Sequence, residues 1–167
     1  MTSPASSENE QCEVLAFCCN YCAYAAADLA GVRRMQYPIN VRIVHFPCTG
    51  KVEMQHILAA FEKGADGVLV AGCLEGGCHF VEGNLRAKRR VEMVRQLLEE
   101  VGIEPERLRM VNLSAAEANT FVARVEEMVE TVNRLGPSPL RKRDAECGAS
   151  QRVAERPNTS SPLMGED

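Results

Sequence analysis

The chain has 167 residues, a formal net charge of −4, 46% apolar residues and no Trp. This length fits one domain with short ends, and the acidic balance argues against nucleic acid as a partner, because binding a phosphate backbone needs an excess of positive charge. No apolar stretch approaches the roughly 20 residues of a membrane-spanning helix, and the polar N-terminus lacks the pattern of a signal peptide. We therefore expect a cytoplasmic protein without membrane insertion.

Both ends of the chain differ in composition from its middle. Residues 1–11 are small and polar, and residues 138–167 are rich in Ser, Pro and charged residues without periodicity. Such segments bury too little apolar surface to fold by themselves. We predict disordered ends on either side of one domain at residues 12–137.

The first half of this domain predicts two strands and two helices. Residues 13–17 form a short apolar run typical of a buried strand, and the Ala-rich segment 23–30 follows it as the first predicted helix. A second strand is predicted at 41–46. Residues 54–61 have apolar side chains at helical spacing, and Gly64 stands where a helix of this length would end.

The second half repeats this alternation. A strand is predicted at 67–71, an amphipathic helix at 91–101, and a weaker strand at 108–113. The capping-box residues 114–117 open the last helical pattern, which ends at Gly136. Alternating strands and helices predict an α/β fold: a small open parallel sheet of about four strands with flanking helices, similar to flavodoxin.

Eight cysteines are a high number for a chain without a secretory signal. In a reducing cytosol such cysteines are more often metal ligands or redox thiols than disulfides. Six of them follow predicted strands: Cys18, Cys19 and Cys22 follow the first strand, Cys48 the second, and Cys73 and Cys78 the third. Because the carboxyl ends of parallel strands meet at one edge of the sheet, we expect these thiols to gather at one site.

The local spacings narrow the chemistry of this site. Cys19 and Cys22 form a C-x2-C pair, and the loop between Cys73 and Cys78 contains two glycines. Thiolates on such loops suit an iron–sulfur cluster or zinc, and the spacing favours the cluster only slightly. Two alternatives therefore stay open: a zinc-stabilised adaptor domain, and a small thiol–disulfide oxidoreductase that uses Cys19 and Cys22.

A basic run follows the last of these cysteines. It consists of Arg86, Lys88, Arg89 and Arg90, directly before the helix predicted at 91–101. Such a run is most often a solvated helix face, but its position beside the predicted site also suits the docking of a partner or contact with a phosphate group.

Four blocks of the sequence carry a resemblance to a known family. They are CNYCAYAAADLAG (19–31), YPINVRIVHFPCTGKV (37–52), AFEKGADGVLVAGCLEGGCHFVEGN (60–84) and RVEMVRQLLEEVGIEPERL (90–108). These blocks resemble the delta subunit of the methyl-viologen-reducing, F420-non-reducing hydrogenase, and the resemblance covers roughly residues 12–137. The five recurrent cysteines of that family correspond to Cys19, Cys22, Cys48, Cys73 and Cys78.

Three features depart from that family. Cys18 stands directly before the C-x2-C pair, and the tail carries Cys147. The family usually has Gly-Asp before the cysteine that matches Cys78, where this chain has Gly76 and Gly77. A missing carboxylate beside a cluster would raise its reduction potential somewhat.

The resemblance implies an iron–sulfur site rather than zinc. It implies one [2Fe-2S] cluster in a subunit that catalyses no bond chemistry of its own. Electrons would pass from a hydrogenase, a formate dehydrogenase or another donor module to the flavin subunit of a heterodisulfide-reductase-like complex.

Such a cluster takes four protein ligands, and this chain offers five thiols. Cys73 and Cys78 share one short loop, and Cys19 and Cys22 lie three residues apart, whereas Cys48 stands alone after its strand. We therefore predict Cys19, Cys22, Cys73 and Cys78 as ligands, with Cys48 as a nearby thiol that can replace one of them.

Overall fold

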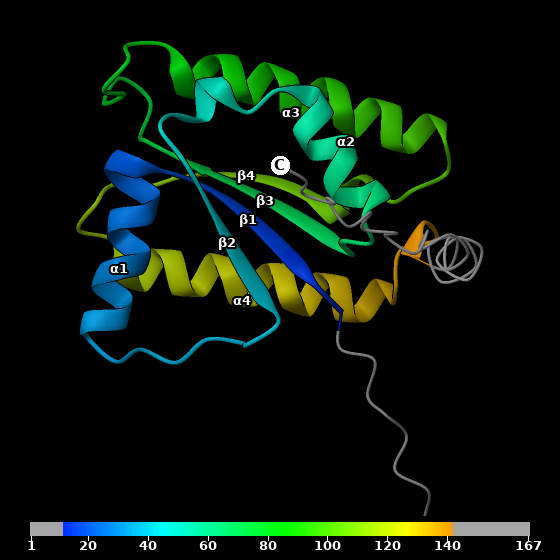
Figure 1. Ribbon diagram of the computed structural model, residues 1–167, viewed down its shortest axis with the longest axis horizontal. Helices are drawn as coiled ribbons and strands as arrows, with labels where there is room; N and C mark the ends of the chain where they lie inside the picture. The colour runs from blue at the N-terminus through cyan, green and yellow to red at the C-terminus, as the bar shows by residue number, and fades with distance from the viewer. Residues whose placement is uncertain (1–11, 142–167) are drawn as a thin grey trace, which may run out of the picture.

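The computed structural model describes residues 12–141 and contains a parallel four-stranded sheet between two pairs of helices (Figure 1). The strands are β1 (Val14–Cys19), β2 (Val41–Phe46), β3 (Gly67–Gly72) and β4 (Leu108–Asn112). The helices are α1 (Ala25–Val32), α2 (Met54–Glu62), α3 (Gly83–Glu100) and α4 (Ala118–Leu135). Three short helical segments join them: η1 (Asn20–Tyr24), η2 (Thr49–Lys51) and η3 (Pro105–Arg107). The predicted fold class is confirmed.

The strand order is β2-β1-β3-β4, and all three pairings are parallel. After β1 the chain adds β2 on one side of β1. It then crosses back and adds β3, followed by β4, on the other side of β1. The carboxyl ends of β1 and β3 are therefore the point at which the winding reverses, which is where open α/β sheets place their functional crevice.

The two faces of the sheet bury separate apolar cores. Ala16 and Leu69 pack against α1 and α4, where Phe121 lies, whereas Phe17 and Val70 pack against α2 and α3. This division follows from the alternation of side chains along a strand, since neighbouring residues face opposite sides. Figure 1 shows α1 and α4 together on one side of the strands and α2 with α3 on the other.

Strand β1 is longer than the sequence predicts. Cys18 and Cys19, which we expected after the strand, are its last two residues. Both extend the pairing with β2, where Cys18 stands opposite His45 and Cys19 opposite Phe46, and Cys18 also stands opposite Ala71 of β3. A cysteine gives little strand signal in a sequence, but a central strand is held by partners on both sides and continues as far as they do.

The folded domain also reaches beyond residue 137, the predicted boundary. The Ser138 amide donates a hydrogen bond to the buried Asp66 carboxylate, and Arg141 pairs with the same carboxylate at 2.7 Å. The buried Arg107 side chain donates to the backbone carbonyls of Asp66 and Gly136. These bonds fasten residues 138–141 beside the start of β3. The predictions for residues 1–11 and for the rest of the tail, Cys147 included, fall outside the described residues.

Within residues 12–141 no helix has the length and apolar character needed to cross a membrane. The same part of the chain contains no disulfide, since each of its cysteines is free.

Candidate metal centre

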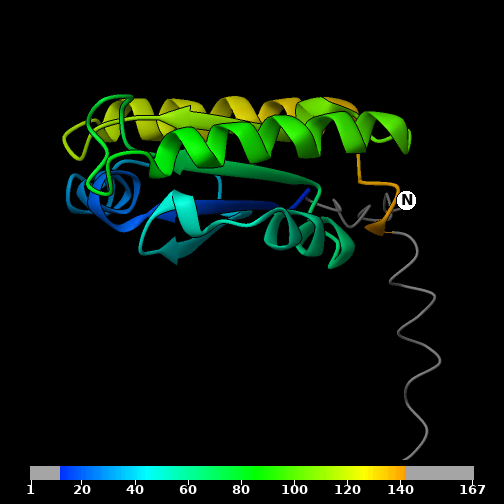
Figure 2. The same cartoon turned by 90° about the horizontal axis from the view of Figure 1, so that it is seen from above.

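Five cysteines meet at the carboxyl end of the sheet. Cys19 ends β1, Cys22 lies in η1, Cys48 follows β2, Cys73 follows β3, and Cys78 lies in the loop before α3. In both Figure 1 and Figure 2 the loop between β3 and α3 lies at the same end of the molecule as the start of α1. The edge predicted from the sequence is therefore where the structure gathers these residues.

Three of the thiols form one group. The sulfur atoms of Cys19, Cys22 and Cys73 all lie within 4.8 Å of one another, and those of Cys19 and Cys73 are 3.6 Å apart. Cys19 and Cys73 meet because β1 and β3 are paired neighbours. The Cys19 sulfur also accepts a hydrogen bond from the Ala23 amide at 3.5 Å, which closes the wide turn of η1 and keeps Cys22 close.

Cys48 and Cys78 form a second group around the start of α3. A Cβ atom at Gly83 would lie 2.2 Å from the Cys48 sulfur and 3.3 Å from the Cys78 sulfur. A Cβ at Gly50 would lie 2.8 Å from the Gly83 Cα. Real Cβ atoms do not approach other atoms as closely as 2.2 or 2.8 Å, so a side chain fits at neither glycine. Gly50 and Gly83 therefore let the loop after β2 approach α3, which brings the two thiols together.

A buried asparagine positions the loop that follows β3. The Asn84 side chain donates hydrogen bonds to the carbonyls of Cys73 at 3.0 Å and Leu74 at 2.9 Å. Asn112 of β4 donates to the same Cys73 carbonyl at 2.5 Å. Sequence reasoning missed Gly50, Gly83 and Asn84, because short-range patterns carry no sign of contacts between distant segments.

Burial keeps most of the site thiols protonated in the metal-free chain. It raises the pKa of Cys73, of Cys48 and of Cys22, since a thiolate loses hydration energy when it leaves water. Neighbouring thiols raise the pKa values further, because two thiolates at such distances repel each other. A bound metal removes this obstacle, because its positive charge stabilises several thiolates at once.

Cys78 is the exception among these thiols. Burial by itself raises its pKa, but hydrogen bonds from the backbone amides of Asn84, Phe80 and Gly83, with a further one from the Cys48 thiol, outweigh burial and lower the pKa. Amides at the start of a long helix favour a negative charge. Cys78 is therefore the thiol of the site that most readily becomes a thiolate.

The other two described cysteines belong to the core. Cys18 is fully buried, and burial, followed by repulsion from Cys19, raises its pKa to about 12. Cys12 lies at the opposite end of the sheet, before β1, where its thiol donates to the Val132 carbonyl.

The structure pairs the predicted ligands differently from the sequence-based prediction. Cys73 and Cys78, predicted as one pair from a shared loop, fall into different groups, because Cys73 lies against Cys19 while Cys78 faces Cys48. Cys48 is thus as well placed as the other four. The ligand set itself stays a prediction.

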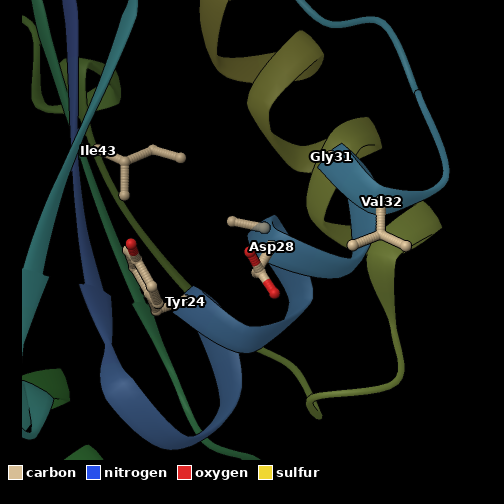
Figure 3. A pocket seen from close by; sticks show the side chains of 6 residues that line it. Tyr24, Asp28, Gly31, Val32 and Ile43 are labelled. Atoms are coloured by element: carbon tan, nitrogen blue, oxygen red, sulfur yellow. The ribbon is translucent and has the colours of Figure 1, made fainter.

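A separate groove lies between α1 and β2 (Figure 3). It has a volume of about 590 Å³ and is lined by Tyr24, Ala27, Asp28, Gly31, Val32 and Ile43. This lining offers one carboxylate and no thiol, so the groove is distinct from the metal centre.

The donor set identifies what the centre can hold. It is made of sulfur alone, and neither a carboxylate nor an imidazole joins Cys19, Cys22 and Cys73 in the group of close metal-binding side chains within the described chain. All-thiolate sites bind soft metals, above all iron in iron–sulfur clusters and zinc. An iron–sulfur cluster therefore fits the residues present.

The chain is similar to proteins of one known family. Residues 14–136 match the family described as methyl-viologen-reducing hydrogenase, delta subunit. The chain is 52% identical over 128 residues to an F420-non-reducing hydrogenase iron–sulfur subunit of Methanocaldococcus jannaschii, an alignment that covers 77% of this chain and 96% of that protein. It is 54% identical over 129 residues to a protein of the same name from Methanopyrus kandleri, covering 77% and 98%.

The domain is also similar to one part of a much longer protein. It is 41% identical over 134 residues to one subunit of the ferredoxin/F420H2-dependent CoB-CoM heterodisulfide reductase of Methanosarcina acetivorans, covering 80% of this chain and 17% of that protein. The family match over residues 14–136 includes every element from β1 to α4 and all five thiols of the centre. The chain therefore belongs to the family of the delta subunit of methyl-viologen-reducing hydrogenase.

Proposed function

We propose that this chain is a cytoplasmic iron–sulfur electron-transfer subunit whose thiols hold one [2Fe-2S] cluster. The observation that carries the proposal is the meeting of five thiols, in two adjacent groups, at the carboxyl end of the sheet. The names of the relatives, which are iron–sulfur subunits of hydrogenases, support iron over zinc.

The two groups suggest how the ligands divide. A [2Fe-2S] cluster takes two protein ligands on each iron. We assign Cys48 and Cys78 to one iron, and two of the three thiols of Cys19, Cys22 and Cys73 to the other. The remaining thiol is a spare beside the cluster. This assignment differs from the sequence-based one because the sulfur atoms of Cys48 and Cys78 both lie beside Gly83.

The chain itself sets how easily the site accepts an electron. When bound, a [2Fe-2S] cluster accepts and releases one electron. The amides of Asn84, Phe80 and Gly83 that favour a thiolate at Cys78 would also stabilise added negative charge there and so raise the reduction potential. Burial of Cys19 and Cys73 has the opposite effect, because a low-dielectric environment disfavours added charge.

The relatives suggest the partners. The relatives from Methanocaldococcus and Methanopyrus carry the name of a hydrogenase subunit, and the Methanosarcina relative carries the name of a heterodisulfide reductase subunit. We propose that the chain relays electrons between a hydrogenase, a formate dehydrogenase or another donor module and the flavin subunit of a heterodisulfide-reductase-like complex. Catalysis then belongs to the assembled complex.

Anaerobic purification of the full chain tests the proposal. We expect brown protein with two irons and two acid-labile sulfides per chain, as a [2Fe-2S] cluster requires. The reduced protein should give the electron paramagnetic resonance signal of one unpaired electron. Colourless protein with one zinc would establish the adaptor alternative, and metal-free protein with a reversible dithiol would establish the oxidoreductase.

A further inference from the structure

An apolar surface surrounds the cysteine centre. Tyr21, Leu74, Phe80 and Val81 are 42%, 45%, 52% and 79% exposed, and His79 beside them is also exposed. We call these five residues the cysteine-end patch. Single exposed apolar side chains are common on proteins, but a group of them around a redox site indicates an interaction surface.

The rings of the patch are ordered against one another. The Tyr21 ring, from η1, stacks on the His79 imidazole with centroids 3.9 Å apart. The Phe80 ring meets both at an angle, with its centroid 5.8 Å from that of Tyr21 and 5.1 Å from that of His79. Two segments far apart in the sequence thus present one preformed apolar surface, which lowers the entropy cost of binding.

Val81 has an unfavourable backbone conformation and an exposed apolar side chain, and the isolated chain explains neither feature. Its φ angle is +62°, in the left-handed region that β-branched residues rarely adopt. Val81 is also more exposed than Tyr21, Leu74 or Phe80, so the isolated chain buries little of its side chain. Backbone strain of this kind occurs mainly at functional sites. A partner that buries the Val81 side chain would offset this backbone strain by removing apolar surface from water.

The edge of the patch is positively charged. Phe80 and two residues of the centre, Cys48 and Gly83, line a cavity of about 330 Å³. Three cations, Lys51, Arg86 and Arg90, and one carboxylate, Glu53, also line it. Arg90 pairs with Glu53 at 3.0 Å and Arg86 with Glu82 at 3.7 Å, whereas Lys51 makes no ion pair within residues 12–141. Lys51 therefore supplies the positive charge of this cavity that no carboxylate of the described residues offsets.

We propose that the cysteine-end patch is the docking surface for the heterodisulfide-reductase-like flavin subunit, which covers the patch with apolar side chains and places an acidic side chain beside Lys51. This inference rests on the proposed function, since electrons pass only between closely approaching centres. The charge at Lys51 selects an acidic partner. The Methanosarcina relative, in which a domain similar to this one forms part of a longer heterodisulfide reductase chain, is consistent with that choice of partner.

Two substitutions test the docking surface in the full chain co-expressed with the flavin subunit of the same organism. Val81→Asn replaces an apolar side chain by a polar one that tolerates positive φ, so the thermal midpoint of unfolding should stay equal or rise. Retention of the flavin subunit should nevertheless weaken on the order of tenfold. Lys51→Glu should weaken retention as well and abolish its dependence on salt concentration.

Val101→Asn is the matched control. Val101 is 69% exposed and lies at the far end of α3, about 27 Å from its start. This variant should retain the flavin subunit like the unmodified chain. Iron content and visible spectrum should be the same in all four proteins, which separates a docking defect from a damaged centre.

Three results would overturn the inference. The first is wild-type retention by both patch variants, and the second is failure of the unmodified, iron-loaded chain to retain the flavin subunit. The third is a dimer of the isolated chain that Val81→Asn converts to monomer, which would assign the patch to a second copy. Absence of iron from the unmodified chain would instead contradict the proposed function, while the retention assay would still report on docking.

Discussion

Gly83 lies directly against Cys48, so close that a Cβ on the glycine would stand 2.2 Å from the cysteine sulfur. Gly83 begins α3 and Cys48 follows β2, so this contact joins two segments that are distant in the sequence. The helix can approach the thiol only where it has no side chain.

Gly83→Ala should therefore displace Cys48 or the start of α3. We expect loss of most of the iron and a decrease in the free energy of unfolding of about 1–3 kcal/mol from overpacking. Iron analysis and thermal unfolding measure both effects. Gly31→Ala is the control, because a Cβ at Gly31 in α1 meets nothing within 4 Å, and it should keep its iron and gain about 0.5–1 kcal/mol.

Asn84→Ala should loosen the loop that carries Cys73. The substitution removes the hydrogen bonds that Asn84 donates to the Cys73 and Leu74 carbonyls, which leaves Asn112 as the side-chain donor to Cys73 and removes the side-chain donor to Leu74. Loss of a partner for a buried carbonyl costs about 1–3 kcal/mol. We expect lower stability and a cluster that is lost faster in air, followed by visible absorption. Asn119→Ala, at an exposed position in α4, should behave like the unmodified chain.

Alanine substitution at each cysteine should rank the ligands. Cys48→Ala and Cys78→Ala should each abolish the cluster, because the two thiols share one iron in our assignment. Cys18→Ala should keep full iron content, since the Cys18 side chain packs in the core. Full iron in Cys48→Ala would instead support the set of Cys19, Cys22, Cys73 and Cys78.

Alkylation of the metal-free chain should begin at Cys78. A lowered pKa means a larger thiolate fraction near neutral pH, and the thiolate is the reacting form. Cys18, with a pKa of about 12, should stay protonated and unlabelled up to pH 9. Mass spectrometry after short exposure to iodoacetamide at pH 7 would give the order. Labelling of Cys18 or Cys73 before Cys78 would contradict the pattern of amide hydrogen bonds.

Truncation should separate the tail from the residues that close the fold. A chain ending at Arg141 should keep its cluster and its stability, because the bonds to Asp66 remain. A chain ending at Pro137 leaves the buried Asp66 carboxylate without two of its partners, which should cost about 3–5 kcal/mol. Chemical unfolding would measure the difference. Equal stability of the two chains would show that residues 138–141 contribute nothing to the fold.

The fold was predictable because its strands are continuous apolar runs and its helices have regular spacing. Residues 67–71 and 41–46 are recognisable without any tertiary information, and so is the apolar face of α4. The end of β1 could not be predicted from the sequence, because Cys18 and Cys19 belong to the strand through their pairing with β2 and β3.

The site was predictable as a set of residues but not as an arrangement. Parallel strands bring their carboxyl ends together, which was enough to gather the five thiols. The strand order decides which thiols lie close together. Cys73 lies against Cys19 because β3 pairs with β1. The glycines that fit Cys48 against α3 follow from packing between segments, which no local pattern encodes.

The bonds around Asp66 have a consequence for how this domain can be joined to other chains. They hold residues 138–141 at the amino end of the sheet, where Cys12 also lies just before β1. Residues 12 and 141 therefore both lie at the end of the sheet opposite the thiols. A further polypeptide can be attached at either side without obstructing the centre, so the same unit is suited to serve as a separate protein or as a module within a longer one.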